Sequence, residues 1–197
     1  MSSTTKEPAY FEELLSRARA ADSSALEALY TELYTPIYRY VYARLGAYPA
    51  QKQLAEDITQ EAFLKLFTNI RAGKMDDFKG TLVGYSFTIA RNLIIDYSRK
   101  KRESLLTTDE ESFDDLPSDQ ISQEEEAHIK IVGSEIFKHI AELPDSMQEV
   151  LILSFVHEYS SEEISAVLSK SEEAVRQLKS RGLRRLRYIM RGQQDSV

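Results

Sequence analysis

The 197-residue chain contains no cysteine and no tryptophan, and it has only seven glycines, five prolines and three histidines. The lack of cysteine excludes disulfides, thiolate zinc sites and cysteine nucleophiles, and it fits a reducing compartment. The three histidines, His128, His139 and His157, do not have metal-ligand spacing, and neither an HExxH motif nor a glycine-rich phosphate loop occurs. We therefore expect no metal site, no cofactor and no enzymatic activity.

Long apolar runs are also absent. No segment approaches the roughly twenty apolar residues of a membrane span, and the N-terminus lacks a basic region followed by an apolar one. We therefore expect a cytoplasmic protein without membrane insertion. The chain does have 11 tyrosines and 8 phenylalanines in periodic apolar segments, with a net charge of −7, which favours a largely helical globular protein over disorder.

Apolar residues recur every three or four positions over most of the chain, which predicts an all-α fold. The pattern predicts helices over residues 12–20, 25–45, 50–70, 85–102 and 125–141, and Pro144 suits the first turn of the next helix. Residues 103–126 hold ten Asp or Glu and no Lys or Arg, a composition typical of an extended linker. We predict two small helical domains, at 1–103 and 124–197, joined by an acidic flexible linker at 104–123.

The most informative segment runs from residue 148 to residue 188 and has the pattern of a helix-turn-helix. A short amphipathic helix around Ile164 has Ser160 or Ser161 as its N-cap, with Glu163 placed to complete a capping box from Ser160. After a polar break, Ser171 caps a second helix, whose apolar positions are expected to face the first helix. Over residues 170–191, eight Lys or Arg stand against two Glu. Most charged helix faces are only solvated, but this excess of cations in an acidic chain indicates DNA contact.

Two further polar patterns precede the linker. On the helix predicted over 50–70, one stripe lies opposite the apolar face and by itself is more often solvated surface: Asp57, Gln60, Glu61 and Leu64. On the helix predicted over 85–102, the apolar face is expected to include Tyr85 and Tyr97, and a basic face lies opposite: Thr88, Arg91, Asn92 and Arg99. The preceding loop carries cations and an aromatic residue, which suits unstacked single-stranded bases, although a loop aromatic is usually a packing anchor.

Two sequence blocks together resemble a known family. The segment AEDITQEAFLKLF followed by FTIARNLIIDYSRKKRE closely resembles the second conserved region of bacterial sigma factors, and the helix-turn-helix resembles their fourth region. The short acidic linker stands in place of the third region, as in the extracytoplasmic-function (ECF) group. The resemblance covers roughly residues 10–190, and it is specific because the two blocks occur in the right order and at the right separation.

The resemblance implies a factor that binds core RNA polymerase and promoter DNA, directs initiation and has an anti-sigma factor as partner. It assigns polymerase binding to Asp57, Gln60, Glu61 and Leu64. It assigns recognition and melting of the minus-ten element to Lys74, Phe78, Lys79, Thr81, Thr88, Arg91, Asn92 and Arg99. It assigns the minus-thirty-five element to Ser171, Glu173, Arg176, Gln177, Lys179, Ser180, Arg184 and Arg187. Melting then needs no catalytic residue, because capture of extruded bases offsets an unstacking cost of a few kcal/mol per base.

The chain departs from the family pattern at three positions. Tyr85 stands where the family often has tryptophan, and Ser86 stands where it often has leucine. The resemblance therefore does not fix the residue at which the melting loop ends. Ser169 replaces the glycine that commonly ends the first helix of the motif, and a left-handed conformation there is costlier for serine.

Three other interpretations are open. A two-domain helix-turn-helix regulator would bind DNA without recruiting polymerase, whereas a helical adaptor would show no salt-sensitive DNA association. An enzyme is disfavoured by the absence of a site. We also expect the acidic linker to mask the two basic helices in the free chain.

Overall fold

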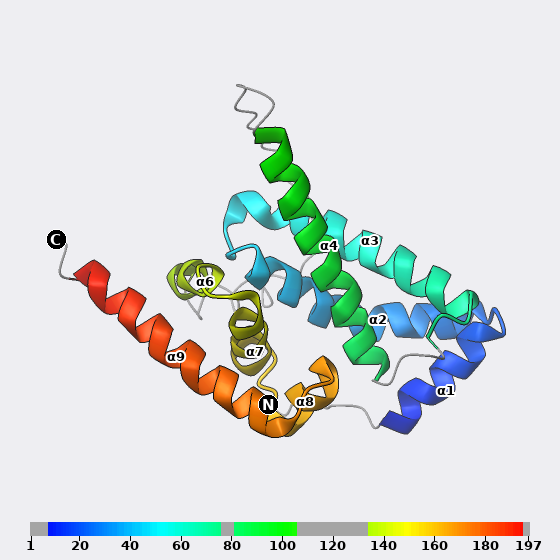
Figure 1. Ribbon diagram of the computed structural model, residues 1–197. Coiled ribbons are helices and arrows are strands. Elements are labelled where there is room, and N and C mark those ends of the chain that lie inside the picture. The colour runs from blue at the N-terminus through cyan, green and yellow to red at the C-terminus, as the bar shows by residue number, and fades with distance from the viewer. Residues whose placement is uncertain (1–7, 76–80, 106–133, 195–197) are drawn as a thin grey trace.

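The computed structural model describes residues 8–75, 81–105 and 134–194, and every regular element in these ranges is helical (Figure 1). The N-terminal group consists of α1 (Pro8–Arg19), α2 (Ser23–Arg44), the 3-10 turn η1 (Pro49–Gln51), α3 (Lys52–Arg71) and α4 (Leu82–Leu105). The C-terminal group consists of α6 (Ser134–Ala141), α7 (Asp145–Val156), α8 (Ser161–Leu168) and α9 (Glu172–Gln194). No helix of the described ranges is long and apolar enough to cross a bilayer.

The all-α fold predicted from the sequence is confirmed, and the first four predicted helices begin and end within four residues of the observed ones. Residues 104 and 105, assigned to the acidic linker by composition, are the last residues of α4. The rest of that linker, and the start of the helix predicted over 125–141, lie outside the described residues.

The α2 helix lies at the centre of the structure. It packs against α1, α3 and α4 of its own group and also against α6 and α7 of the C-terminal group. Leu29, Ile37 and Val41 are fully buried along it, whereas Glu27 and Thr31 on its other side are exposed. The buried face of an amphipathic helix is stable only when neighbours cover it.

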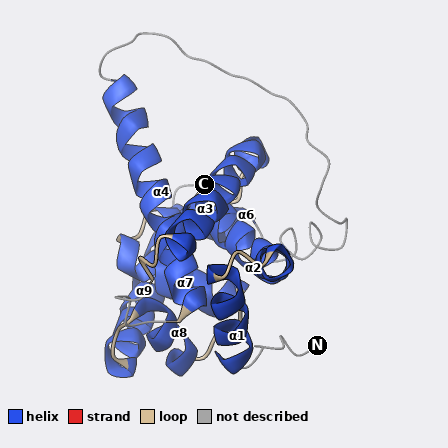
Figure 2. Cartoon of the chain, turned by 90° about the vertical axis from the view of Figure 1, so that its right-hand side faces the viewer, coloured by secondary structure: helices blue, strands red, loops and turns tan. Residues whose placement is uncertain are grey.

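The α4 helix packs on α2 and α3 through Phe87, Ala90 and Leu93, which are all buried. Its C-terminal end projects beyond the other helices in both views (Figures 1 and 2). The sequence pattern placed Tyr97 on the inner face of this helix, and that prediction is wrong, because Tyr97 is exposed on the projecting part. Helical periodicity identifies a face, but it cannot show where the neighbouring helices end.

The C-terminal group is built around α7, whose central residues Val150 to Leu153 are fully buried. The α9 helix packs along both α7 and α8. The sequence predicted that its apolar positions face the preceding helix, and Gly182 also lies close to α7, where an added Cβ would be 3.2 Å from Leu151 Cδ1. Because α7 also packs on α2 and α8 packs on α4, the two groups lie in direct contact (Figure 1).

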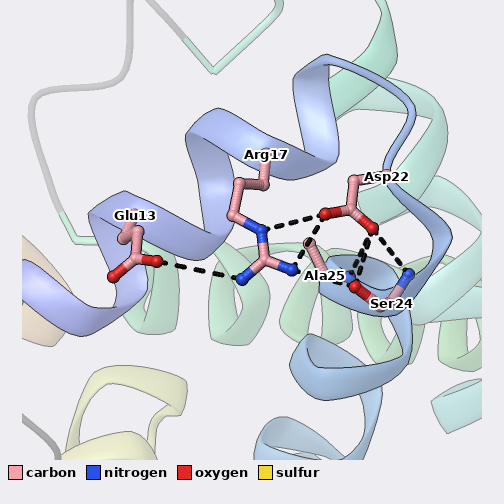
Figure 3. A network of polar contacts seen from close by, with 5 residues as sticks. All are labelled: Glu13, Arg17, Asp22, Ser24 and Ala25. Carbon is pink, nitrogen blue, oxygen red and sulfur yellow. Dashed lines mark hydrogen bonds and ion pairs between the residues drawn. The ribbon is translucent and has the colours of Figure 1, made fainter.

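A polar network fixes the turn between α1 and α2 (Figure 3). Asp22 is the N-cap of α2, and its Oδ1 accepts from the backbone N–H of Ser24 at 2.9 Å and of Ala25 at 3.4 Å. The Ser24 hydroxyl also donates to Oδ1 at 2.7 Å, and Arg17 Nε donates to Oδ2 at 2.9 Å. The hydrogen bond from the Ser24 side chain and the one from Arg17 lower the pKa of Asp22 from 3.8 to about 2.

The lowered pKa of Asp22 predicts a stability loss in acid. Its carboxylate contributes fully to the stability of the fold above about pH 4, and this contribution is lost as the pH falls through the pKa of about 2. Asp22→Asn keeps an N-cap acceptor but has no charge. We expect its melting temperature to be lower than that of wild type at neutral pH and to fall less on acidification, whereas Asp22→Ala is less stable than Asp22→Asn throughout.

Thermal melts followed by circular dichroism between about pH 6 and about pH 2 check this expectation. Glu13→Gln is the matched control, because Glu13 also faces Arg17, but at 3.8 Å and without capping a helix. An identical acid profile for wild type and Asp22→Asn would show that the network does not depend on the carboxylate charge.

Candidate nucleic-acid interface

The outward side of α3 carries the stripe that the sequence predicts to bind polymerase. All four of its residues are exposed: Asp57, Gln60, Glu61 and Leu64. Ile58 and Leu66 on the other side of the helix are buried against the core. The charges of the stripe are held by neighbours on the same helix, since Gln53 Nε2 donates to Asp57 Oδ1 at 3.2 Å and Lys65 Nζ lies 3.0 Å from Glu61 Oε1. The stripe is therefore accessible to another molecule along its whole length.

The loop before α4 is described only in part. Phe78 and Lys79 lie outside the described residues, whereas Lys74 is exposed after the end of α3. Thr81 starts α4, because its Oγ1 accepts from the backbone N–H of Gly84 at 3.0 Å. Thr88 is half-buried, and its hydroxyl donates to the Gly84 carbonyl at 2.9 Å. Both threonine hydroxyls thus have partners within the helix, and the capping role of Thr81 was not recognised from the sequence.

The predicted basic face of α4 is divided. Asn92 and Arg99 are exposed, and Arg99 Nη2 lies 3.3 Å from Asp96 Oδ1 on the same helix. Arg91 instead reaches the C-terminal group, where its Nε lies 2.6 Å from Glu149 Oε1 of α7. These two atoms do not align as a hydrogen bond, so the contact is an ion pair. Arg91, from the middle of the predicted face, is thus paired with a residue 58 positions later in the sequence.

A second polar contact between the groups surrounds Arg44 at the end of α2. Arg44 is buried, and its Nη1 donates to Gln148 Oε1 at 2.6 Å while its Nη2 lies 3.0 Å from Asp145 Oδ1. Gln148 in turn donates through Nε2 to the carbonyls of Leu143 at 2.6 Å and Ala141 at 2.9 Å. These hydrogen bonds satisfy carbonyl groups at and just after the end of α6, and they hold in place the Gln148 side chain that accepts from Arg44.

Two titratable side chains of α7 are buried where the groups meet. Burial raises the pKa of Glu149 above its usual value, although the positive charges of Arg91 and Arg44 act in the opposite direction. Burial, with a smaller effect of Arg39, lowers the pKa of His157 to about 3. His157 packs edge-on against Phe87 of α4, with ring centroids 5.4 Å apart. Both shifts have the sign expected when a charged form loses its hydration.

Sequence reasoning did not find this contact between the groups. Glu149 immediately precedes the apolar run VLILSFV, and Arg44 is the last residue but one of the helix predicted over 25–45. A charged residue at the edge of a buried stretch is a usable signal, because full burial of a charge requires a partner. The signal does not name the partner, since Arg44 and Gln148 are 104 positions apart. His157 is the C-cap of α7.

The α9 helix presents the predicted recognition surface. Ser171 is its N-cap, and its Oγ accepts from the backbone N–H of Ala174 at 3.2 Å. Glu172 pairs with Arg176, and Glu173 Oε1 accepts from Gln177 Nε2 at 3.0 Å, so each acid of the first turn holds a side chain one turn later. The predicted residues Glu173, Arg176, Gln177, Ser180, Arg184 and Arg187 are exposed, and Lys179 is half-buried. Exposed residues of this helix outside the predicted set include Arg181, Arg185 and Tyr188.

Comparison with known proteins identifies both groups. Residues 29–104 match the family described as Sigma-70 region 2, and residues 139–188 match the family described as Sigma-70, region 4. The chain belongs to the sigma-70 family of RNA polymerase sigma factors. Several of its curated relatives carry the name of the ECF group, in agreement with the resemblance found in the sequence.

Two of these sigma factors illustrate the extent of the similarity. BldN of Streptomyces coelicolor is 31% identical over 180 residues, which cover 90% of this chain and 65% of BldN. SigM of Bacillus subtilis is 29% identical over 160 residues, which cover 80% of this chain and 93% of SigM. The chain therefore spans slightly less than two thirds of BldN but most of SigM.

Two solved structures share the fold of this sigma factor chain. CnrH, solved with the cytosolic domain of CnrY, is 20% identical with a TM-score of 0.59 and covers 92% of this chain and 97% of its own. The sigma factor RpoE of Bartonella quintana, solved with the anti-sigma factor NepR, is 18% identical with a TM-score of 0.55 and covers 84% and 96%. At these identities the likeness concerns the fold alone.

The helix-turn-helix of this sigma factor chain has an unusual turn. The capping box at the start of α8 is confirmed, since Glu163 N–H donates to Ser160 Oγ at 3.2 Å and Ser160 N–H donates to Glu163 Oε2 at 2.7 Å. At the other end, Ser169 has φ 51 and ψ 42, which is the left-handed conformation. From the sequence, this conformation is expected to be less favourable for serine than for glycine. Ser169 nevertheless adopts it, so the turn keeps the left-handed geometry at a cost in free energy.

Replacement of the left-handed serine is therefore expected to stabilise the motif. We predict that Ser169→Gly raises the free energy of unfolding by about 1 kcal/mol, because glycine adopts this conformation without the Cβ clash. Ala166→Gly in the middle of α8 is the matched control and should lose about 1 kcal/mol. Urea unfolding followed by circular dichroism gives both values, and a lower midpoint for Ser169→Gly would contradict the assigned turn.

Proposed function

We propose that the chain binds core RNA polymerase and directs promoter recognition, promoter melting and transcription initiation. The observation that carries the proposal is the combination, in one chain, of an exposed acidic stripe on α3, a basic α4 and a helix-turn-helix with a basic α9. A regulator that only binds DNA has no need for the first of these surfaces. The exposed Leu64, which is 68% accessible between acidic and polar neighbours, favours a protein partner for the stripe.

The two groups are proposed to bind different targets. We propose that residues 1–103 form the domain that binds polymerase and the minus-ten element, and that residues 124–197 form the domain that binds the minus-thirty-five element, with 104–123 as the connection. Exposed arginines near the start of α9 suit base edges, whereas those further along suit phosphates. Opening of the duplex requires only that captured bases offset the cost of unstacking, so no catalytic residue and no cofactor are needed.

The proposed partners are core polymerase, promoter DNA and an anti-sigma factor. The last is supported by the complex of the sigma factor RpoE of Bartonella quintana with the anti-sigma factor NepR. We place the activity in the cytoplasm, where polymerase and promoters are found. Run-off transcription with purified core polymerase on promoter fragments is the decisive experiment. Transcripts that require the chain support the proposal, whereas DNA binding without any transcript would favour a regulator that does not recruit polymerase.

Charge reversal on α3 tests the polymerase surface. Asp57→Lys is expected to weaken binding to core polymerase by at least about tenfold, because a cation replaces an exposed carboxylate at the N-terminal end of the stripe. The fold should be unchanged, since exposed substitutions usually alter stability by less than about 0.5 kcal/mol. Glu27→Lys on the exposed side of α2 is the control with the same change of charge. Co-purification and circular dichroism are the measurements, and equal polymerase binding by both variants would remove this assignment.

Two arginines of α9 test the division between bases and phosphates. Arg176→Ala should relax the preference at particular upstream bases, because a bidentate contact to a base contributes about 1–3 kcal/mol of discrimination. Arg184→Ala should weaken all sequences alike and reduce the slope of the salt dependence by about one. Binding to a set of single-base promoter variants at several salt concentrations separates the two. A uniform loss for Arg176→Ala would count against base reading.

A further inference from the structure

The C-terminal half of α9 borders a groove to which the proposed function assigns only Arg184. The groove has a volume of about 760 Å³ and lies where α9 runs past the junction of α6 with α7 (Figure 1). We call it the α9 groove, and it is lined by Glu142, Met147, Arg181, Arg184, Arg185, Tyr188 and Ile189. Its size falls within the range of about 300–1,000 Å³ that is usual for small-ligand sites.

Three arginines of the groove are not held by an acid. Arg181, Arg184 and Arg185 are exposed, and none of them has an ion-pair or hydrogen-bond partner among the described residues. Arg176, earlier on the same helix, pairs with Glu172. Like charges four positions apart weaken a helix, so the three guanidinium groups are unfavourable to the fold by themselves. An anion bound in the groove removes this repulsion.

The groove also presents an apolar surface. Tyr188 is 80% accessible, although its ring is a large apolar group. Met147 and Ile189 line the groove with it and are half-buried against the core. The absence of a side chain at Gly182 brings α9 close to α7 here, since an added Cβ would lie 3.5 Å from Met147 Cβ. An exposed ring next to apolar side chains is a surface on which an aromatic base can stack.

One carboxylate lines the same groove. Glu142 is exposed, and its Oε1 lies 3.3 Å from His139 Nδ1. Within the described ranges it pairs with none of the three arginines. The two oxygens of a carboxylate can accept two neighbouring N–H groups. Guanine presents such a pair at N1 and N2, whereas adenine has an acceptor at N1.

The spacing of these groups matches one nucleotide. Arg181 and Tyr188 are seven positions apart, which corresponds to about 10 Å along the helix axis. This length is comparable with that of a nucleoside diphosphate. Arginine binds phosphate oxygens through parallel N–H donors. Phosphates held at Arg181 and Arg185 therefore leave the base near Tyr188.

Two other anionic ligands do not use all of these residues. Duplex DNA keeps the faces of its bases stacked inside the double helix, so Tyr188 and the apolar side chains have no role in binding it. An acidic peptide brings its carboxylates close to Glu142, and like charges repel. A free nucleotide uses the arginines, the ring and the carboxylate together.

We infer that the α9 groove binds a guanine nucleotide with at least two phosphates. Arg181, Arg184 and Arg185 hold the phosphates. Tyr188 stacks on the base, and Glu142 accepts from the N–H groups at N1 and N2. The site goes beyond the proposed function and does not depend on it, since nucleotide binding needs neither polymerase nor promoter DNA.

Isothermal titration calorimetry of the full-length chain with GDP tests the inference. We expect saturable binding of one GDP per chain, at least about tenfold tighter than that of ADP, because only guanine donates two hydrogen bonds to the Glu142 carboxylate. Guanosine lacks phosphates and inorganic pyrophosphate lacks a base. Each should bind at least about tenfold more weakly than GDP.

Substitutions in the groove separate the roles of its residues. Arg181→Ala combined with Arg185→Ala should weaken GDP binding by about tenfold or more. Tyr188→Ala should weaken it by about fivefold or more, whereas Tyr188→Phe keeps the ring and should bind as the wild type does. Glu142→Gln should remove most of the preference for GDP over ADP. Arg191→Ala, which is exposed on the same helix outside the groove, is the matched control and should change neither quantity.

The substituted residues are exposed, so circular dichroism should show an intact fold in every variant. Arg184 stays unchanged because it is also proposed to contact promoter phosphates. The absence of saturable GDP binding up to about 1 mM overturns the inference, and so does a short single-stranded DNA that binds through Arg181 and Tyr188 when GDP does not. Equal affinity for GDP and pyrophosphate overturns the assignment of the base. Unchanged GDP affinity in the double arginine variant overturns the location.

Discussion

Burial of the α2 helix on several sides is the constraint on which the rest of the structure depends. It packs against α1, α3 and α4 of its own group and against α6 and α7 of the C-terminal group. Each fully buried leucine or isoleucine on this helix, such as Leu29 or Ile37, contributes about 1.5–3 kcal/mol. The buried residues of α2 are therefore shared between the two groups, so the C-terminal group packs against the helix that also forms the core of the N-terminal group.

The packing on α2 decides how the functional surfaces are exposed. The stripe on α3 and the basic side of α9 face solvent, whereas the first half of α4 lies under α7 and α8. The charges at this junction are complementary, with Arg44 and Arg91 on one side and Asp145 and Glu149 on the other. Complementary charges fix the register of such a contact, but buried ones add little net stability. The arrangement is therefore specific without being permanent, which suits the proposed function, in which the two groups bind separated promoter elements.

Local features were predictable from the sequence because they depend on neighbours along the chain. The capping box of Ser160 and Glu163, the N-cap Ser171 and the left-handed Ser169 follow from hydrogen bonds and sterics within a few residues. The engagement of Arg91 was not predictable, because helical periodicity groups it with Asn92 and Arg99 and carries no information about α7. The roles assigned to individual site residues are still predictions. Phe78 and Lys79, on which the prediction of base stacking depends, lie outside the described residues.

The distance between the two groups, measured in the free chain and in the polymerase complex, tests the central claim most directly. The chain has no cysteine, so Thr31→Cys on α2 and Glu162→Cys on α8 provide unique exposed positions for a pair of spin labels. Pulsed electron paramagnetic resonance should give one narrow, short distance for the free chain and a longer one when core polymerase is bound. A broad distribution in the free chain, or an unchanged short distance in the complex, would contradict a contact between the two groups that holds the free chain closed and is released on polymerase.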